Sequence, residues 1–149
     1  MRLIKHIVVH CSATIERQSF TAKDIDRWHK QRGWKGNGYH YVIGLNGAVE
    51  KGRPDWQIGA HVKGYNRHSI GVVYIGGLAK NLAPKDTRTH AQKYALQTLL
   101  KNLKQKYPFA KIVGHRDFSK DLNGNGVIEP FEFQKACPCF DAKNEYKIL

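Results

Sequence analysis

The chain alternates between short apolar runs and segments with helical periodicity, and this alternation constrains the fold more than any other feature of the sequence. Strands that alternate with helices favour an α/β layer structure. The first helix is predicted over 21–32, because Thr21 is a candidate N-cap and Asp24 follows it three residues later. A longer amphipathic helix ends before Pro108. Its apolar face is predicted to consist of Ala91, Ala95, Leu99 and Leu103, with Tyr94 and Leu100 beside them.

The apolar runs define the predicted sheet. The first run is rich in branched residues and ends at His10. Two β-type runs, 39–45 and 48–51, surround an Asn-Gly turn and should pair as a hairpin. The run that starts at Ser69 is typical of a central strand, and a short later strand ends at His115. We therefore expect one α/β domain over residues 1–149, with a central mixed β-sheet flanked by helices.

Charge and hydropathy restrict the partners. The formal net charge of +13 indicates an anionic partner or environment, such as nucleic acid, an acidic membrane surface or an anionic cell wall. Lysine and arginine are spread along the chain without a dense basic run, which argues against sequence-specific binding of nucleic acid. We expect no membrane span, because no apolar run approaches about 20 residues. Lys5 and His6 interrupt the first apolar stretch, so we expect no signal peptide and synthesis in the cytoplasm.

Two histidines and a cysteine are candidate metal ligands. His10 and His115 each end a predicted strand, and Cys137 follows His115 by 22 positions. Two imidazoles and a thiolate are a usual ligand set for zinc, and three protein ligands leave a fourth position for water. Spacing alone does not select this triple, because eight histidines and three cysteines offer many others and both histidines could be loop residues. The wide separations argue against a zinc finger.

Four sequence blocks occur in a fixed order: VHCSAT, WHKQRGWKGNGYHYVI, GAHVKGYNRHSIGV and KACPCFD. Together they resemble the bacteriophage-type N-acetylmuramoyl-L-alanine amidases, zinc enzymes related to the peptidoglycan recognition proteins, from about residue 3 to residue 141. The resemblance implies hydrolysis of the amide bond between N-acetylmuramoyl and L-alanine in bacterial peptidoglycan. We expect a monomeric phage or prophage lytic enzyme that acts on the wall after release, and a secreted antibacterial effector is the alternative context. A non-catalytic peptidoglycan-binding module is the alternative, although such modules typically lack the cysteine ligand.

The resemblance also implies roles for single residues. His10, His115 and Cys137 would hold zinc, and Tyr39 and Lys135 would be catalytic. Lys135 could stabilise an oxyanion, and Tyr39 could orient water or move a proton. Without the resemblance, Tyr39 would be a core aromatic residue and Lys135 a solvated charge.

The third of these blocks, GAHVKGYNRHSIGV, resembles the part of the family that lines the cleft. His61 and Asn66 are candidate hydrogen-bond partners of a substrate carbonyl, and loop architecture is the alternative. We expect Trp28, His29 and Trp34 to pack in the protein rather than contact substrate. Cys11 should face the core, opposite to its neighbour on the strand. Cys139 is interpreted as a free or packed thiol, because a disulfide to a residue two positions away would be strained.

Residues 117–133 depart from the small phage amidases, whose connection is shorter. The sequence DLNGNGVIEPFE matches an EF-hand loop, although the run before it is too short for an entering helix and an Asn/Gly-rich turn needs no metal. We expect calcium there, with a structural role in placing Lys135 and the cysteine ligand. The predicted ligands are Asp121, Asn123, Asn125, the Val127 carbonyl, Glu129 and Glu132.

Overall fold

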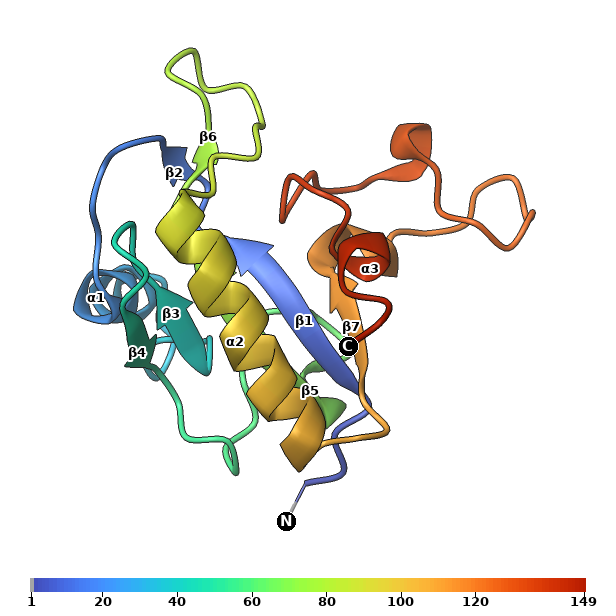
Figure 1. The fold of residues 1–149 in the computed structure, drawn as a ribbon, viewed down its shortest axis with the longest axis horizontal. Coiled ribbons are helices and arrows are strands. Elements are labelled where there is room, and N and C mark those ends of the chain that lie inside the picture. Colours follow the sequence, from blue (N-terminus) through green and yellow to red (C-terminus); the bar gives the residue numbers. More distant parts are fainter. Residues whose placement is uncertain (1) are drawn as a thin grey trace.

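The computed structural model describes residues 2–149, and its centre is a mixed β-sheet with the strand order β4-β3-β5-β1-β7 (Figure 1). The strands are β1 (His6–Cys11), β3 (Tyr41–Ile43), β4 (Val49–Lys51), β5 (Ser69–Tyr74) and β7 (Lys111–Gly114). All neighbouring pairs are parallel except the β3–β4 hairpin, which is antiparallel. The predicted mixed sheet, its hairpin and its central strand β5 are therefore confirmed.

Short elements connect the strands at the edges of this sheet. A small parallel sheet joins β2 (Thr14–Ile15) to β6 (Gly77–Leu78). The described residues also form three 3-10 turns: η1 (Asn66–His68), η2 (His115–Phe118) and η3 (Pro130–Glu132). No helix within residues 2–149 is long and apolar enough to cross a membrane.

Helices cover both faces of the sheet. Helix α1 (Ala22–Gln31) begins at Thr21, whose side chain and that of Asp24 form the predicted capping box. It packs against the face that carries Val42 and Val73. Helices α2 (His90–Lys106) and α3 (Ala142–Glu145) belong to the larger core on the opposite face. Side chains alternate along a strand, so β3 and β5 contribute to both of these cores, whereas Val8 on β1 and Val113 on β7 form a third, smaller cluster with Val62.

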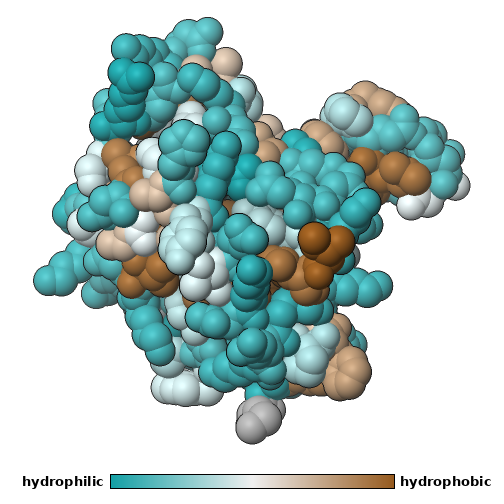
Figure 2. Space-filling view, in the orientation of Figure 1, coloured by the Kyte–Doolittle hydropathy of each residue, from teal (hydrophilic) through white to brown (hydrophobic). Residues whose placement is uncertain are grey.

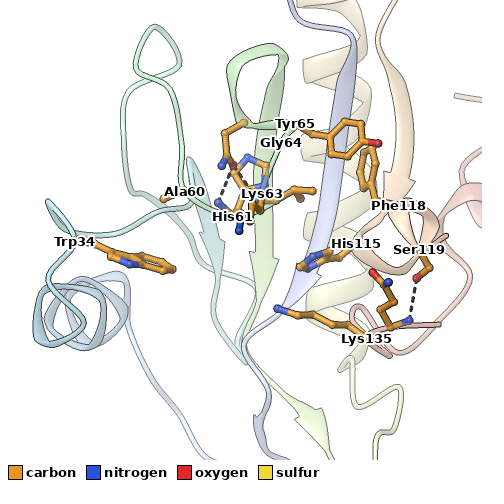
Figure 3. A pocket seen from close by; sticks show the side chains of 13 residues that line it. Trp34, Ala60, His61, Lys63, Gly64, Tyr65, His115, Phe118, Ser119 and Lys135 are labelled. Carbon is orange, nitrogen blue, oxygen red and sulfur yellow. Dashed lines mark hydrogen bonds between the residues drawn. The ribbon is translucent and has the colours of Figure 1, made fainter.

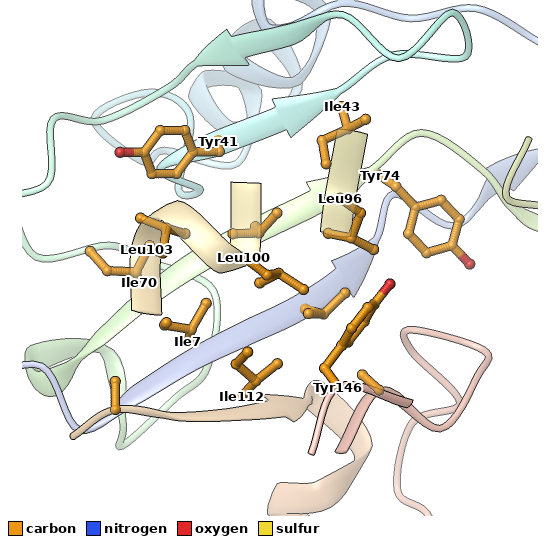
Figure 4. Close-up of a cluster of buried hydrophobic side chains, with 14 of the residues drawn as sticks. Ile7, Tyr41, Ile43, Ile70, Tyr74, Leu96, Leu100, Leu103, Ile112 and Tyr146 are labelled. Carbon is orange, nitrogen blue, oxygen red and sulfur yellow. The ribbon is translucent and has the colours of Figure 1, made fainter. Parts of the chain in front are cut away.

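The predicted apolar face of α2 was wrong in part. Ala91 is exposed and the Tyr94 side chain is 76% exposed, whereas Ala95 packs only partly against the core. The buried positions are Gln92, Leu96, Leu100 and Leu103, and the three leucines face the sheet in Figure 4. A polar side chain accounts for this choice of buried face, because the Gln92 amide donates hydrogen bonds to the carbonyls of Ile43 and Ile75, 3.3 and 2.9 Å away.

A long arm leaves the compact body between η2 and the C-terminal segment. Residues 119–133 project to the right in Figure 1 and contain only the short turn η3. Leu122, Val127 and Phe131 are 67, 59 and 65% exposed, and the arm shows apolar surface in Figure 2. The arm is therefore supported mainly by its own hydrogen bonds.

Candidate functional site

The three predicted metal ligands lie together at the C-terminal edge of the sheet. Strands β1 and β7 are parallel neighbours, so His10 on β1 and His115 directly after β7 have ring centroids 4.8 Å apart. Cys137 comes from the C-terminal segment, and its sulfur accepts a hydrogen bond from the Cys11 backbone N–H at 3.2 Å. One ligand atom from each of the three residues lies within 4.8 Å of the others.

The spacing and chemistry of these atoms fit a zinc ion. Ligand atoms around a tetrahedral zinc are roughly 3.3–3.6 Å apart when Zn–N is about 2.0 Å and Zn–S about 2.3 Å. His10 Nδ1 lies 3.8 Å from Cys137 Sγ, and all three ligand atoms lie within 4.8 Å of one another, so they would have to move closer by at most roughly 1.5 Å around a zinc ion. Burial lowers the pKa of His10 well below its ordinary value. Burial and the charge of Lys135 lower the pKa of His115 to about 4. Both imidazoles are then neutral at pH 7, which is the metal-binding form.

Tyr39 and Lys135 line the same small cavity as the three ligands, which has a volume of about 250 Å³. The Tyr39 ring centroid lies 5.1 Å from that of His10. Burial raises the pKa of Tyr39 above its ordinary value, and the neighbouring thiols of Cys137 and Cys11 add to this effect, so the phenol stays protonated at neutral pH. Lys135 is exposed and reaches the cavity from its rim.

A larger cleft of about 650 Å³ adjoins this cavity and shares His61, His115 and Lys135 with it. Figure 3 shows Trp34 on one side of the cleft and Tyr65 with Phe118 on the other. The rings of Tyr65 and Phe118 have centroids 4.2 Å apart. An open groove with aromatic side chains on opposite sides can hold an extended ligand beside the cavity.

Three of these aromatic residues were missed as cleft residues. Trp34 was expected only to pack; it contacts His29 at 4.6 Å between centroids, but it is 39% exposed and lines both cavities. Tyr65 lies inside the block that signalled the cleft, so the sequence did hold a signal for it. Phe118 had none. Trp28 packs on Phe20, and His29 is a buried acceptor for the Gly38 N–H at 2.8 Å. Both also line the smaller cavity, so their expected lack of contact with substrate stays a prediction.

His61 and Asn66 lie in the wall of the cleft and contact each other. The Asn66 side-chain oxygen accepts hydrogen bonds from the backbone N–H groups of His61 and Val62, at 2.8 and 2.9 Å. His61 Nδ1 lies 2.9 Å from His10 Nε2, and its Nε2 lies 3.2 Å from the Ser69 hydroxyl. These contacts are architectural, and the predicted role of both residues in binding substrate stays a prediction.

The other two cysteines lie on the α2 side of the sheet. Cys11 is buried in the main core, as its place on the strand predicted, and Cys139 packs against the same core. All three cysteines are free thiols, and the sulfurs of Cys11 and Cys139 are 3.8 Å apart. Contact with Cys137, together with burial, raises the pKa of the Cys11 thiol to about 12. Of the three cysteines, only Cys137 belongs to the cluster of candidate ligands among the described residues.

The EF-hand-like residues of the arm bind its backbone and one another. The Asp121 carboxylate accepts hydrogen bonds from the N–H groups of Gly124 and Gly126, at 3.0 and 2.7 Å. Glu132 is 2% exposed and accepts from Leu122 N–H and, at 2.9 Å, from Glu129 N–H. Asn123, Asn125 and Val127 take part in the same turns. Within residues 2–149, only His10, His115 and Cys137 form a cluster of His, Cys, Asp or Glu that could hold a metal. Calcium binding stays a prediction.

Comparisons with known proteins agree on one family. The family profile described as N-acetylmuramoyl-L-alanine amidase matches residues 1–139. The endolysin of Klebsiella phage KP32 is 41% identical over 137 residues, which cover 92% of this chain and 82% of that protein. The solved amidase LysC from Clostridium intestinale has a TM-score of 0.67 and 31% identity, over 87% of this chain and 80% of its own. Drosophila PGRP-LB, at 23% identity and a TM-score of 0.73, shares the fold over 99% of this chain and 82% of its own.

Proposed function

The chain belongs to the N-acetylmuramoyl-L-alanine amidase family, and we propose that its cleft hydrolyses the amide bond between N-acetylmuramoyl and L-alanine of bacterial peptidoglycan with a zinc ion held by His10, His115 and Cys137. The observation that carries the proposal is the convergence of two neutral imidazoles and a thiol on one small cavity beside an open cleft. A zinc ion held there would supply Lewis-acid chemistry, polarising a carbonyl oxygen and acidifying a water molecule.

The protein's own groups would divide the remaining work. Hydrolysis adds water to the lactyl carbonyl carbon, breaks the C–N bond and delivers a proton to the leaving amine of L-alanine. Lys135, at the rim of the cavity, would place its ammonium group beside the oxygen that becomes negative. A thiolate ligand cancels part of the metal charge, so this second cation has a clear use. Tyr39 remains protonated in its half-buried position and would orient water or hand a proton onward.

The cleft would hold the rest of the substrate. We propose that the stem peptide and its sugar lie between Trp34 and the Tyr65–Phe118 pair, with His61 and Asn66 in the wall beside them. Aromatic faces suit sugar rings and peptide planes, while the open ends of the groove admit a polymer.

Digestion of purified peptidoglycan, read by mass spectrometry, tests the proposal. The wild type and Cys139→Ser should release stem peptides with free L-alanine amino groups, and Cys137→Ser should release none. Zinc content should follow the same pattern, near one ion per chain for the wild type and Cys139→Ser only. An active Cys137→Ser variant would remove the proposed ligand set. A wild type that sediments with the wall but releases nothing would be a recognition module.

We also propose that the arm binds calcium through Asp121, Asn123, Asn125, the Val127 carbonyl, Glu129 and Glu132. The support is the position-by-position match to an EF-hand loop and the turns that these side chains already form. Thermal unfolding of the zinc-loaded protein should shift upward with calcium and should not shift with magnesium at the same concentration. Unchanged unfolding and unchanged turnover across a calcium titration would remove this proposal.

For its place of action, we propose synthesis in the bacterial cytoplasm and attack on the wall after release, as a monomer. The net charge of +13 would hold the protein on an anionic wall. Cell fractionation before and after lysis should find the protein first in the cytoplasmic fraction and then with the wall. Sedimentation of the purified protein should give the mass of one chain, 17.0 kDa.

A further inference from the structure

One side chain contacts the candidate ligand His10 from the side opposite to the metal position. His10 is 1% exposed, and its Nδ1 points toward the Cys137 sulfur, 3.8 Å away. Its other nitrogen, Nε2, lies 2.9 Å from His61 Nδ1. His61 Nε2 in turn lies 3.2 Å from the hydroxyl of Ser69, which is fully buried. Three side chains therefore form a hydrogen-bonded row that begins at the metal position and ends at β5.

The positions of the protons in this row follow from the chemistry of the first member. A nitrogen that binds a metal carries no proton, so the proton of a neutral His10 is on Nε2 and is donated to His61 Nδ1. His61 is then an acceptor at Nδ1, and its own proton on Nε2 is donated to the Ser69 hydroxyl. Only this set of tautomers gives every ring nitrogen in the row a matching partner while leaving His10 Nδ1 free.

The surrounding backbone fixes the His61 ring in this position. Asn66 accepts hydrogen bonds from the N–H groups of His61 and Val62, which fixes the start of the loop. On β5, Gly71 leaves the space that the ring occupies, because a β-carbon there would lie 2.7 Å from ring atoms of His61. The ring is thus held by the loop on one side and by β5 on the other (Figure 3).

We infer that His61 is a positioning residue for the metal centre: it accepts the Nε2–H of His10 and so fixes the tautomer and the ring plane of that ligand. The inference rests on the proposed zinc site. Partners of this kind commonly orient metal-binding histidines, and their loss costs about 10–100-fold in metal affinity. Most such partners are carboxylates, carbonyls or water. A neutral imidazole adds no negative charge, so the charge of a zinc ion with a single thiolate ligand is reduced no further.

Zinc affinity, measured on the full chain by competition with a chromophoric chelator, tests this role without relying on turnover. His61→Leu removes the acceptor, and the affinity should fall by about 10–100-fold. His61→Asn places an amide oxygen near the position of Nδ1, so the affinity should stay within about threefold of the wild type. Ser69→Ala removes only the hydroxyl next to His61 Nε2, so it should lower the zinc affinity less than His61→Leu does. Circular dichroism of each variant checks that it is folded.

The possible outcomes distinguish a failure of the positioning role of His61 from a failure of the proposed zinc site. Equal zinc affinity of His61→Leu and wild type would overturn the positioning role and leave the zinc site intact. An equal loss in His61→Asn and His61→Leu would show that ring packing, not hydrogen-bond acceptance, matters. A wild type that binds no zinc would overturn the proposed metal centre and this inference with it. Nitrogen NMR of the zinc-loaded wild type needs no variant: the proton of His10 must be on Nε2, and a proton on Nδ1 would refute the inference.

Discussion

Replacing Arg88 by alanine should destabilise the fold by about 3 kcal/mol, because this side chain ties the start of α2 to the C-terminal helix. The Arg88 side chain is 2% exposed. Its guanidinium group donates hydrogen bonds of 2.7–2.9 Å to the carboxylates of Asp86 and Glu145 and to the hydroxyl of Tyr146. The same group lies over the Phe140 ring, 3.3 Å from its centroid.

The magnitude follows from what the substitution leaves behind. Removing one partner of a buried ion pair costs about 3–5 kcal/mol. The side chains of Asp86 and Glu145 are 33% and 44% exposed, so water can solvate the orphaned carboxylates and the lower end applies. For a chain of this size, about 3 kcal/mol lowers Tm by roughly 6–12 °C. Arg88→Lys keeps the charge but loses the planar fork and should cost about 1–2 kcal/mol.

The effect should depend on pH with a defined sign. Hydrogen bonds to Arg88 lower the pKa of Glu145. Burial alone would raise the pKa of Asp86, but its bonds to Arg88 outweigh burial and lower it. Lowered carboxyl pKa values stabilise the fold above the unfolded values near 4, and this stabilisation is lost as pH falls through the folded values.

Urea unfolding of wild type, Arg88→Ala and Arg88→Lys, at pH 7 and pH 3, measures both the size and the sign. The gap between wild type and Arg88→Ala should shrink at pH 3. An alanine variant within about 0.5 kcal/mol of wild type at pH 7, or a gap that is the same at both pH values, would refute the reasoning.

Three further outcomes are expected. Tyr39→Phe and Lys135→Met should each lower kcat on peptidoglycan by about 100-fold or more while zinc content stays at the wild-type level; loss of zinc would mean a structural role instead. Burial, with the charges of two nearby arginines, lowers the pKa of His29 to about 4. The folded form therefore resists protonation, and the free energy of unfolding should fall as pH is lowered from 6.5 to 4. In urea unfolding of His29→Leu, this free energy should depend less on pH over the same range. Gly71→Ala should cost about 1–3 kcal/mol in thermal unfolding and weaken zinc binding, because its β-carbon would displace the His61 ring; unchanged values for both would contradict the close packing.

The β3–β4 hairpin and the two long helices were predictable because each depends on local signals. The Asn-Gly turn predicted the β3–β4 hairpin, and Thr21 with Asp24 predicted the start of α1. The buried face of α2 was less predictable. Periodicity counts only apolar side chains, whereas Gln92 is buried to cap strand-end carbonyls, and that requirement depends on where the strands end in space. Tertiary hydrogen bonds thus set the rotation of a helix whose existence the sequence already indicated.

The spacing of residues in the sequence was not enough to predict the candidate site. His10 and His115 could be placed at strand ends from the sequence, but their adjacency depends on β1 and β7 being neighbours in the sheet, which local signals do not specify. The ordered blocks selected Cys137 among three cysteines. No block indicated Phe118, which enters the cleft only because η2 turns the chain back after His115.

The contacts of Cys137 and Lys135 separate the roles of the core and the arm. Cys137 is held by direct bonds to the body: its carbonyl accepts the Arg116 N–H at 2.8 Å, and its sulfur accepts the Cys11 N–H. The next residue, Pro138, is fixed by the Tyr74 hydroxyl at 2.6 Å. None of these bonds passes through the arm. Lys135 instead directly follows Gln134, whose N–H donates a hydrogen bond to the hydroxyl of Ser119, the first residue of the arm, and the Lys135 side chain is exposed. Ordering of the arm should therefore affect the position of the Lys135 ammonium group. Loss of calcium is then expected to lower turnover while zinc affinity stays unchanged.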